Sequence, residues 1–235
     1  MAKSELANLL KTAKMELGKW ASNSIELLSD NDHSEAIQVN LDKFVSTLGI
    51  RWHPWSDSFF FEVSLPPPNA KCTKQVILSK TARLFDPFVW IPPIIIVAKI
   101  LIQDLSLRKE CWDTDWREQT ETEYWDTIQN SLTNLKNIKI LRWTGITAEQ
   151  AWELHIFSDA SKRAYASEVY AVVTYNRPTL LMSKTKVAPT LDLPQLELCG
   201  EFILSRLTTH LVNSLENKPS KIRLWCYSKV VLNWL

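Results

Sequence analysis

Two acidic side chains stand at positions from which they could act together on metal ions. Asp159 follows a short apolar run, residues 154–158, and Glu197 lies at the start of an amphipathic stretch. Carboxylate oxygens suit Mg²⁺, and two such ions about 4 Å apart can activate a water and stabilise the leaving oxygen of a phosphodiester. The two acids therefore indicate a candidate metal site. Each also has a simpler interpretation, because Asp159 suits a turn and Glu197 suits the first turn of a helix.

The segment that carries both acids has the pattern of a mixed sheet with one long helix. Strands are predicted over residues 154–158, 165–175 and 179–183 and, after the helix, over residues 222–226. Apolar side chains at steps of three and four indicate the helix: Leu196, Cys199, Ile203, Leu207, Leu211 and Leu215. The predicted order is β-β-β-α-β, and Tyr227 follows the last strand. Strand ends and an adjoining helix are rigid supports for a metal site.

The upstream residues indicate a helix, a hairpin and three further helices. A helix is expected over residues 3–17, and residues 53–57 are expected to join two strands, residues 48–52 and 58–63, as a hairpin. Beyond a proline-rich break at residues 66–69, helices are expected over residues 73–85, 94–109 and about 124–135. We therefore predict an α+β or α/β protein in three parts: a helix-plus-hairpin segment (residues 1–68), a helical connector (69–150) and a mixed sheet (151–235).

Composition narrows the classes of protein that are possible. The chain has 235 residues, is 46% hydrophobic and carries a net charge of +1, so any attraction for nucleic acid must come from a local basic surface. Its four cysteines form no CxxC pair, which argues against a zinc ribbon. The N-terminus lacks the pattern of a signal peptide, and Pro92-Pro93 interrupt the one strongly apolar run. We expect an intracellular protein, cytoplasmic or nuclear.

An ordered set of short motifs resembles the Pol polyprotein of Bel/Pao-type LTR retrotransposons. Residues 19–23 and 48–52 resemble the end of its reverse transcriptase, and residues 78–87 with 99–103 resemble its connector. The ribonuclease H-like region is matched by His155-x-Phe157-Ser158-Asp159-Ala160-Ser161, by residues 184–189, by Leu196-Glu197-Leu198-Cys199, and by Trp225-Cys226-x-Ser228 with Val231-Leu232-x-Trp234. The resemblance covers nearly the whole chain in the expected order.

This resemblance implies reverse transcription and Mg²⁺-dependent cleavage of RNA in RNA–DNA hybrids. Asp159 and Glu197 match metal-binding acids of the family, whereas Tyr227 stands where the family has a third acid. A phenol with a pKa of about 10 is a poor Mg²⁺ ligand at neutral pH. A fourth acid is expected beyond Leu235 and the paired polymerase acids upstream of Met1. We therefore expect impaired catalysis; the alternatives are a non-catalytic nucleic-acid-binding or interaction module, or a decaying retroelement relic.

Contacts with an RNA–DNA hybrid or a single strand are expected at two places. The hairpin that contains Trp52 resembles a primer-contacting hairpin, although its aromatic side chains could equally fill a core. Around the candidate metal site, four cations could neutralise phosphates or could be ordinary surface charges: Lys162, Arg163, Lys184 and Lys186.

Four further residues depart from the expected pattern. The family has a glycine where Val89 stands, so a positive φ there would strain this β-branched residue. Glu168 places a charge in an apolar strand, where it either lies on an exposed face or destabilises the strand. Asp192 and Glu201 are extra acids near Glu197; we interpret them as surface charges, and the alternative is that either one substitutes for the lost metal ligand.

Overall fold

The computed structural model describes residues 2–15, 21–24, 44–47, 50–63, 71–84, 86–116, 120–173 and 177–234. The chain forms two compact units. The first contains Met1–Phe60 with Ile138–Arg142, and the second contains Phe61–Asn137 with Trp143–Leu235. The proline-rich break at residues 66–69 lies outside the described residues.

The first unit contains a helix and a small antiparallel sheet. Helix α1 (Ala2–Thr12) is followed by strands in the order β1-β2-β3-β4. Their bounds are β1 Val45–Thr47, β2 Ile50–His53, β3 Ser58–Phe60 and β4 Lys139–Leu141. The β2–β3 hairpin agrees with the prediction. Strands β1 and β4 were not predicted, and β4 comes from a stretch that was expected only to connect two parts of the chain.

Helix α1 ends earlier than its apolar pattern predicts. Lys14 has a φ of 55°, and the amide of Met15 donates to the carbonyl oxygen of Leu10 at 2.9 Å. A left-handed residue followed by this long backward hydrogen bond is a helix C-cap of the Schellman type. Because that position usually holds glycine, a lysine there gives no sequence signal for the end of the helix.

The second unit begins with three connector helices. They are α2 (Lys74–Ala82), α3 (Pro92–Leu107) and α4 (Thr120–Thr133), with a 3₁₀ turn η2 (Asn134–Asn137) after α4. The hydroxyl of Thr73 accepts from the amide of Val76 at 3.2 Å and caps α2, and Pro92 fits the first turn of α3, where no amide hydrogen is needed. The helices share an apolar core: Cys72, Ile77, Ala98, Leu101, Leu105, Trp116, Trp125 and Ile128.

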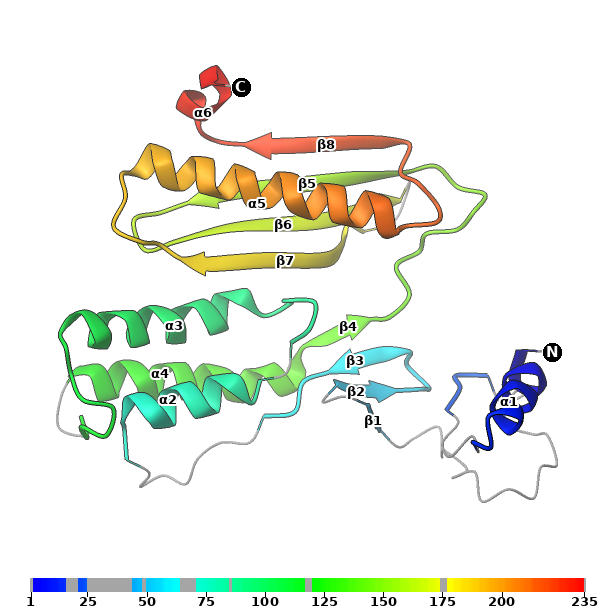
Figure 1. Ribbon diagram of the computed structural model, residues 1–235, viewed down its shortest axis with the longest axis horizontal. Coiled ribbons are helices and arrows are strands. Elements are labelled where there is room, and N and C mark those ends of the chain that lie inside the picture. The colour runs from blue at the N-terminus through cyan, green and yellow to red at the C-terminus, as the bar shows by residue number, and fades with distance from the viewer. Residues whose placement is uncertain are drawn as a thin grey trace. The chain divides into compact units, whose positions relative to one another are not determined.

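The same unit contains a four-stranded mixed sheet with one long helix on one face (Figure 1). Its elements are β5 Trp152–Ala160, β6 Ala164–Val173, β7 Thr179–Val187, α5 Leu193–Ser214, β8 Lys221–Cys226 and α6 Lys229–Trp234. The strand order is β7-β6-β5-β8, and only β5 and β8 run parallel. The core between sheet and α5 is formed by Trp152, Leu154, Ile156, Val169, Ala171, Val173, Ile203, Leu204 and Leu207. The predicted β-β-β-α-β order is confirmed.

A tight loop and helix α3 attach the connector to strand β7. The amide of Ser183 donates to the carbonyl oxygen of Phe88 at 3.2 Å, and its hydroxyl donates to that of Val89. The indole N–H of Trp90 donates to the carbonyl oxygen of Leu181 at 3.2 Å. Val89 has a φ of 55°, so the predicted strain at this residue is present.

The connector helices and the mixed sheet thus belong to one compact unit. The three-part division of the chain, with boundaries at residues 68 and 150, stays a prediction. Among the described helices, none combines the length and the hydropathy that crossing a lipid bilayer requires.

Candidate functional site

Helix α5 approaches the end of strand β5 closely at Gly200. A Cβ atom placed on Gly200 would lie 3.7 Å from the carbonyl oxygen of Asp159 and 3.7 Å from the Cβ of Ser158. The hydroxyl of Ser167 donates to the carbonyl oxygen of Gly200 at 3.0 Å, which fixes the helix to β6 as well. The first turns of α5, which carry Glu197, are therefore held beside the strand end that carries Asp159.

The carboxylates at this place accept hydrogen bonds from different partners. Asp159 is exposed, and its Oδ1 accepts from the amide of Ala160 at 2.9 Å. Glu197 Oε2 accepts from the hydroxyl of Ser228, and Glu201 Oε1 accepts from the hydroxyl of Ser158. Asp159 and Glu197 thus lie on neighbouring elements, but each is bound by its own donor. Glu201 was interpreted as a surface charge and is instead half-buried at the strand end.

Ser228 connects Glu197 to the C-terminal helix. Its hydroxyl oxygen accepts from the amide of Val231 at 3.3 Å, and its carbonyl oxygen accepts from the amide of Leu232 at 3.0 Å. A serine at this position caps the start of α6 while its own hydroxyl hydrogen goes to the carboxylate. Ser228 is buried, and the sequence placed it in a family motif without assigning it a role.

The thiol of Cys226 is a neutral neighbour of the acids. Burial raises the pKa of Cys226, and a hydrogen bond to Glu201 raises it further. The amide of Ser228 donates to Sγ at 3.2 Å. A thiol whose pKa is raised stays protonated at neutral pH, so it offers Glu201 a hydrogen.

Tyr227 points into solvent. Its side chain is 92% exposed, although the residues on either side of it contact Glu201 and Glu197. Within the part of the chain that the structure describes, no group of three or more His, Cys, Asp and Glu side chains could hold a metal ion. The described side chains at this place therefore do not make a complete Mg²⁺ site.

All four predicted cations are exposed near this end of the sheet. Lys162 lies in the β5–β6 turn, and Lys184 and Lys186 lie on β7. The register pairs Ala164 with Val187, which brings the turn next to the end of β7. The fourth, Arg163, is already paired, because its Nη2 lies 2.5 Å from Oδ2 of Asp104. Arg163 is therefore the weakest of the four as a phosphate contact.

The charge of Glu168 does not lie in the core between the sheet and α5. Its neighbours Ser167 and Val169 are buried towards α5, so Glu168 lies on the other face of the sheet. There the hydroxyl of Tyr170 donates to its carboxylate at 2.9 Å. Burial, followed by this contact with Glu168, raises the pKa of Tyr170 to about 12.

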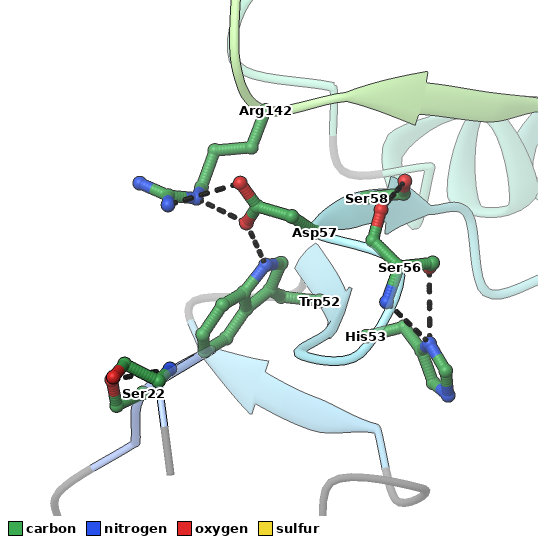
Figure 2. Close-up of polar contacts among 8 residues, drawn as sticks. Ser22, Trp52, His53, Ser56, Asp57, Ser58 and Arg142 are labelled. Atoms are coloured by element: carbon green, nitrogen blue, oxygen red, sulfur yellow. Dashed lines mark hydrogen bonds and ion pairs between the residues drawn. The ribbon is translucent and has the colours of Figure 1, made fainter. Parts of the chain in front are cut away.

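In the first unit, Trp52 helps to hold the hairpin turn (Figure 2). Its indole N–H donates to Oδ1 of Asp57 at 3.0 Å, and Arg142 binds the same carboxylate with Nε at 2.6 Å and Nη2 at 3.1 Å. Asp57 has a φ of 44°, so the turn is fixed by these contacts in an uncommon backbone conformation. Trp55, at the tip of the turn, is 75% exposed and was not predicted from the sequence as a contact residue.

A mixed sheet in this order with a long helix on one face defines the class as ribonuclease H-like. The family model described as "Pao retrotransposon-like RNaseH-like domain" matches residues 73–228, which is more than half of the chain. The chain therefore belongs to this Pao retrotransposon family, and the resemblance inferred from its motifs is confirmed. A comparison with curated proteins found no match.

A comparison with solved structures found partial likeness to, among others, two structures of a foamy viral protease-reverse transcriptase. One, in complex with an RNA/DNA hybrid, has a TM-score of 0.45 and 15% identity and covers 80% of this chain and 25% of that chain. The other, in complex with dsDNA, has a TM-score of 0.42 and 11% identity and covers 82% of this chain and 39% of that chain. The present chain thus spans well under half the length of these proteins.

Proposed function

We propose that this chain is part of a Pao-type Pol polyprotein whose ribonuclease H-like region binds nucleic acid but cleaves RNA in RNA–DNA hybrids weakly or not at all. Asp159 and Glu197 are the remaining metal-binding acids in this proposal. The observation that carries it is the exposed phenol of Tyr227, at the position where the family has a third acid. The upstream segment is, in the same proposal, the end of the reverse transcriptase and makes no DNA by itself.

The physical argument concerns the number of ligands. A two-metal site needs several carboxylates to hold two dications close together against their mutual repulsion. Replacing one carboxylate by a neutral phenol removes a full negative charge and a hard ligand. Glu197 also accepts a hydrogen bond from Ser228, and a metal ion would have to compete with this donor for the same oxygen. We expect Mg²⁺ to bind weakly in consequence.

Cleavage of a labelled RNA–DNA hybrid in Mg²⁺, and separately in Mn²⁺, tests the proposal. The chain should cut no faster than its Asp159→Asn variant. Robust cutting that Asp159→Asn abolishes would overturn the proposal.

A repaired variant tests the role assigned to residue 227. Tyr227→Asp should bind Mn²⁺ more tightly and cut faster than Tyr227→Asn, which removes the ring without adding a charge. Equal metal binding by the two variants would show that this position does not contribute to the site.

A non-catalytic binding module is the second candidate, and the exposed Lys162, Lys184 and Lys186 favour it. Three lysines that neutralise phosphates would give a slope of log K against log salt of about −3 on duplex or hybrid. Binding of this kind with no cutting would support a module, whereas a chain that melts without a cooperative transition and binds nothing would identify a relic.

A further inference from the structure

The last turns of helix α3 are bound to the loop that joins β5 to β6, residues 161–163. Nη2 of Arg163 in this loop lies 2.5 Å from Oδ2 of Asp104 on α3. One residue earlier on the helix, the side-chain amide of Gln103 donates to the carbonyl oxygen of Ala188 at 2.8 Å. The amide of Ala188, a buried residue after β7, donates in turn to the carbonyl oxygen of Arg163 at 2.9 Å. We call these three contacts the α3 clasp.

Asp104 occupies a place where the helix itself disfavours an anion. Helix α3 ends at Leu107, so Asp104 lies in its last turn, and that turn contains no basic side chain. The carbonyl oxygens at a helix C-terminus carry partial negative charge and make a carboxylate unfavourable there. The guanidinium of Arg163 offsets this cost. Because an ion pair between two partly exposed side chains adds little stability by itself, its main effect is on the position of the loop.

Hydrogen bonds within the loop transmit this position to Lys162. The hydroxyl oxygen of Ser161 accepts from the amides of Arg163 and Ala164, both at 3.2 Å. The amide of Ser161 donates to the carbonyl oxygen of Ala164 at 2.8 Å. Lys162 stands between these bonded residues, three positions after Asp159, and it is exposed. Its backbone is therefore fixed from both sides, and through Arg163 it is fixed relative to α3.

Lys162 adds a third cation to two exposed lysines on the outer strand β7. Lys184 pairs across the sheet with Ser167, whose hydroxyl donates to α5. Lys184 and, two residues on, Lys186 therefore lie on the α5 side of the sheet. Lys186 lies two residues before Ala188, whose amide and carbonyl groups both belong to the α3 clasp. The α3 clasp thus sets where Lys162 lies relative to the lysines of β7.

We propose that Asp104 is a positioning residue for the binding of nucleic acid. Through Arg163 it holds the β5–β6 loop so that Lys162 contacts a backbone phosphate, while Lys184 and Lys186 bind neighbouring phosphates. This inference rests on the nucleic-acid binding proposed above. An anion with no such role would only repel phosphates or mask Arg163. The two possibilities predict opposite signs, because loss of Asp104 weakens binding in the first case and strengthens it in the second.

Binding of a labelled RNA–DNA hybrid at several salt concentrations measures this sign. By fluorescence anisotropy, Asp104→Ala should raise the Kd about five- to tenfold at 0.1 M salt and reduce the salt slope by about 0.9, as Lys162→Ala should. In the Lys162→Ala background, Asp104→Ala should have no further effect. Glu216→Ala is the matched control: it removes an exposed acid beyond the C-terminal end of α5, and it should not weaken binding.

A charge swap separates pairing from direct contact. Asp104→Arg combined with Arg163→Asp keeps an ion pair and the net charge, so the Kd should return to within about threefold of the parent value. A swapped chain that binds as weakly as Arg163→Ala would overturn the proposal, because the guanidinium would then touch a phosphate itself. If Asp104→Ala binds as tightly as the parent or more tightly, while Lys162→Ala binds weakly, the positioning role is wrong and nucleic-acid binding stands.

Hydrogen exchange tests the α3 clasp without nucleic acid. The amides of Ser161 and Ala188 donate to carbonyl oxygens at the loop, and both should exchange faster in Asp104→Ala than in the parent chain or in Glu216→Ala. Unchanged exchange would overturn the positioning role whatever the affinity for hybrid. A parent chain that binds no hybrid would overturn both this inference and the proposed binding. Equal thermal transitions confirm that the variants are folded.

Discussion

Replacing Val89 by glycine should stabilise the protein, because the backbone at this residue is left-handed. Asp86 and Pro87 begin a tight turn in which the amide of Val89 donates to the carbonyl oxygen of Asp86 at 3.2 Å. The Asp86 carboxylate accepts from the amides of Trp90 at 2.8 Å and Ile91 at 2.9 Å, so the turn is held from both sides. The φ of 55° at Val89 is therefore imposed by its surroundings, and glycine is the residue that adopts it without strain.

The size of the effect follows from two opposing terms. A left-handed conformation costs an ordinary L-residue about 1–2 kcal/mol, and a β-branched residue is the least suited to it. Glycine relieves this cost but loses about 0.5–1 kcal/mol of stability in return, because the unfolded chain is more flexible at a glycine. The free energy of unfolding of Val89→Gly should therefore exceed that of Val89→Ala by about 0.5–1 kcal/mol. Alanine is the matched control, since it also removes the half-buried methyl groups.

Urea unfolding and thermal melts of the three proteins measure this difference. A change of this size should raise the Tm of the glycine variant above that of the alanine variant by about 2 °C. The glycine variant should also exceed the parent chain, provided that the methyl groups of Val89 contribute little. A glycine variant no more stable than the alanine variant would refute the conclusion that this turn is strained.

Three further perturbations have defined outcomes. Ser183→Ala should lower the free energy of unfolding by about 1–3 kcal/mol, because the carbonyl oxygen of Val89 loses its hydroxyl donor in a buried place; urea unfolding measures the loss. The hydrogen bond from Arg223 depresses the pKa of Glu153 in the folded chain, so its contribution is present above the unfolded value of about 4.5 and is lost as pH falls towards 2. Glu153→Gln should therefore be less stable than the parent at pH 7 and equal to it near pH 2, and an unchanged difference across that range would contradict the role of Arg223. Lys184→Ala should reduce the salt slope of hybrid binding by about 0.9, whereas an unchanged slope would show that this lysine touches no phosphate.

The sequence predicted the mixed sheet well because its elements are long and periodic. Strands β5 to β7 have nine or ten residues, and α5 repeats its apolar side chains through 22 residues. A signal of that length comes from burial against one face, so it survives local exceptions such as Glu168. Strands β1 and β4 have three residues each and exist only as partners of β2 and β3, which no local pattern can show.

The candidate site was predicted less completely, because its hydrogen bonds join distant residues. Sequence patterns gave a role to Asp159 and Glu197, but none to the serines that donate to Glu197 and Glu201, although both serines stand in the family motifs. The ion pair between Arg163 and Asp104 joins a β-turn to a connector helix, and no local sequence pattern near either residue predicts it. At the hairpin, Trp52 was selected by its resemblance to a motif, although its contacts hold the turn and Trp55 is the exposed ring.

The parallel pairing of β5 with β8 has a consequence for synthesis of the protein. Leu154 pairs with Ile222, so the strand that carries Asp159 gains its second neighbour only after α5 and the following turn have been translated. Until then β5 is itself an outer strand, on a nascent chain whose apolar face is already formed. In ribosome-bound chains that end before β8, one edge of β5 should therefore be unpaired and accessible to chaperones. Strand β5 becomes a central strand of the sheet only when β8 pairs with it.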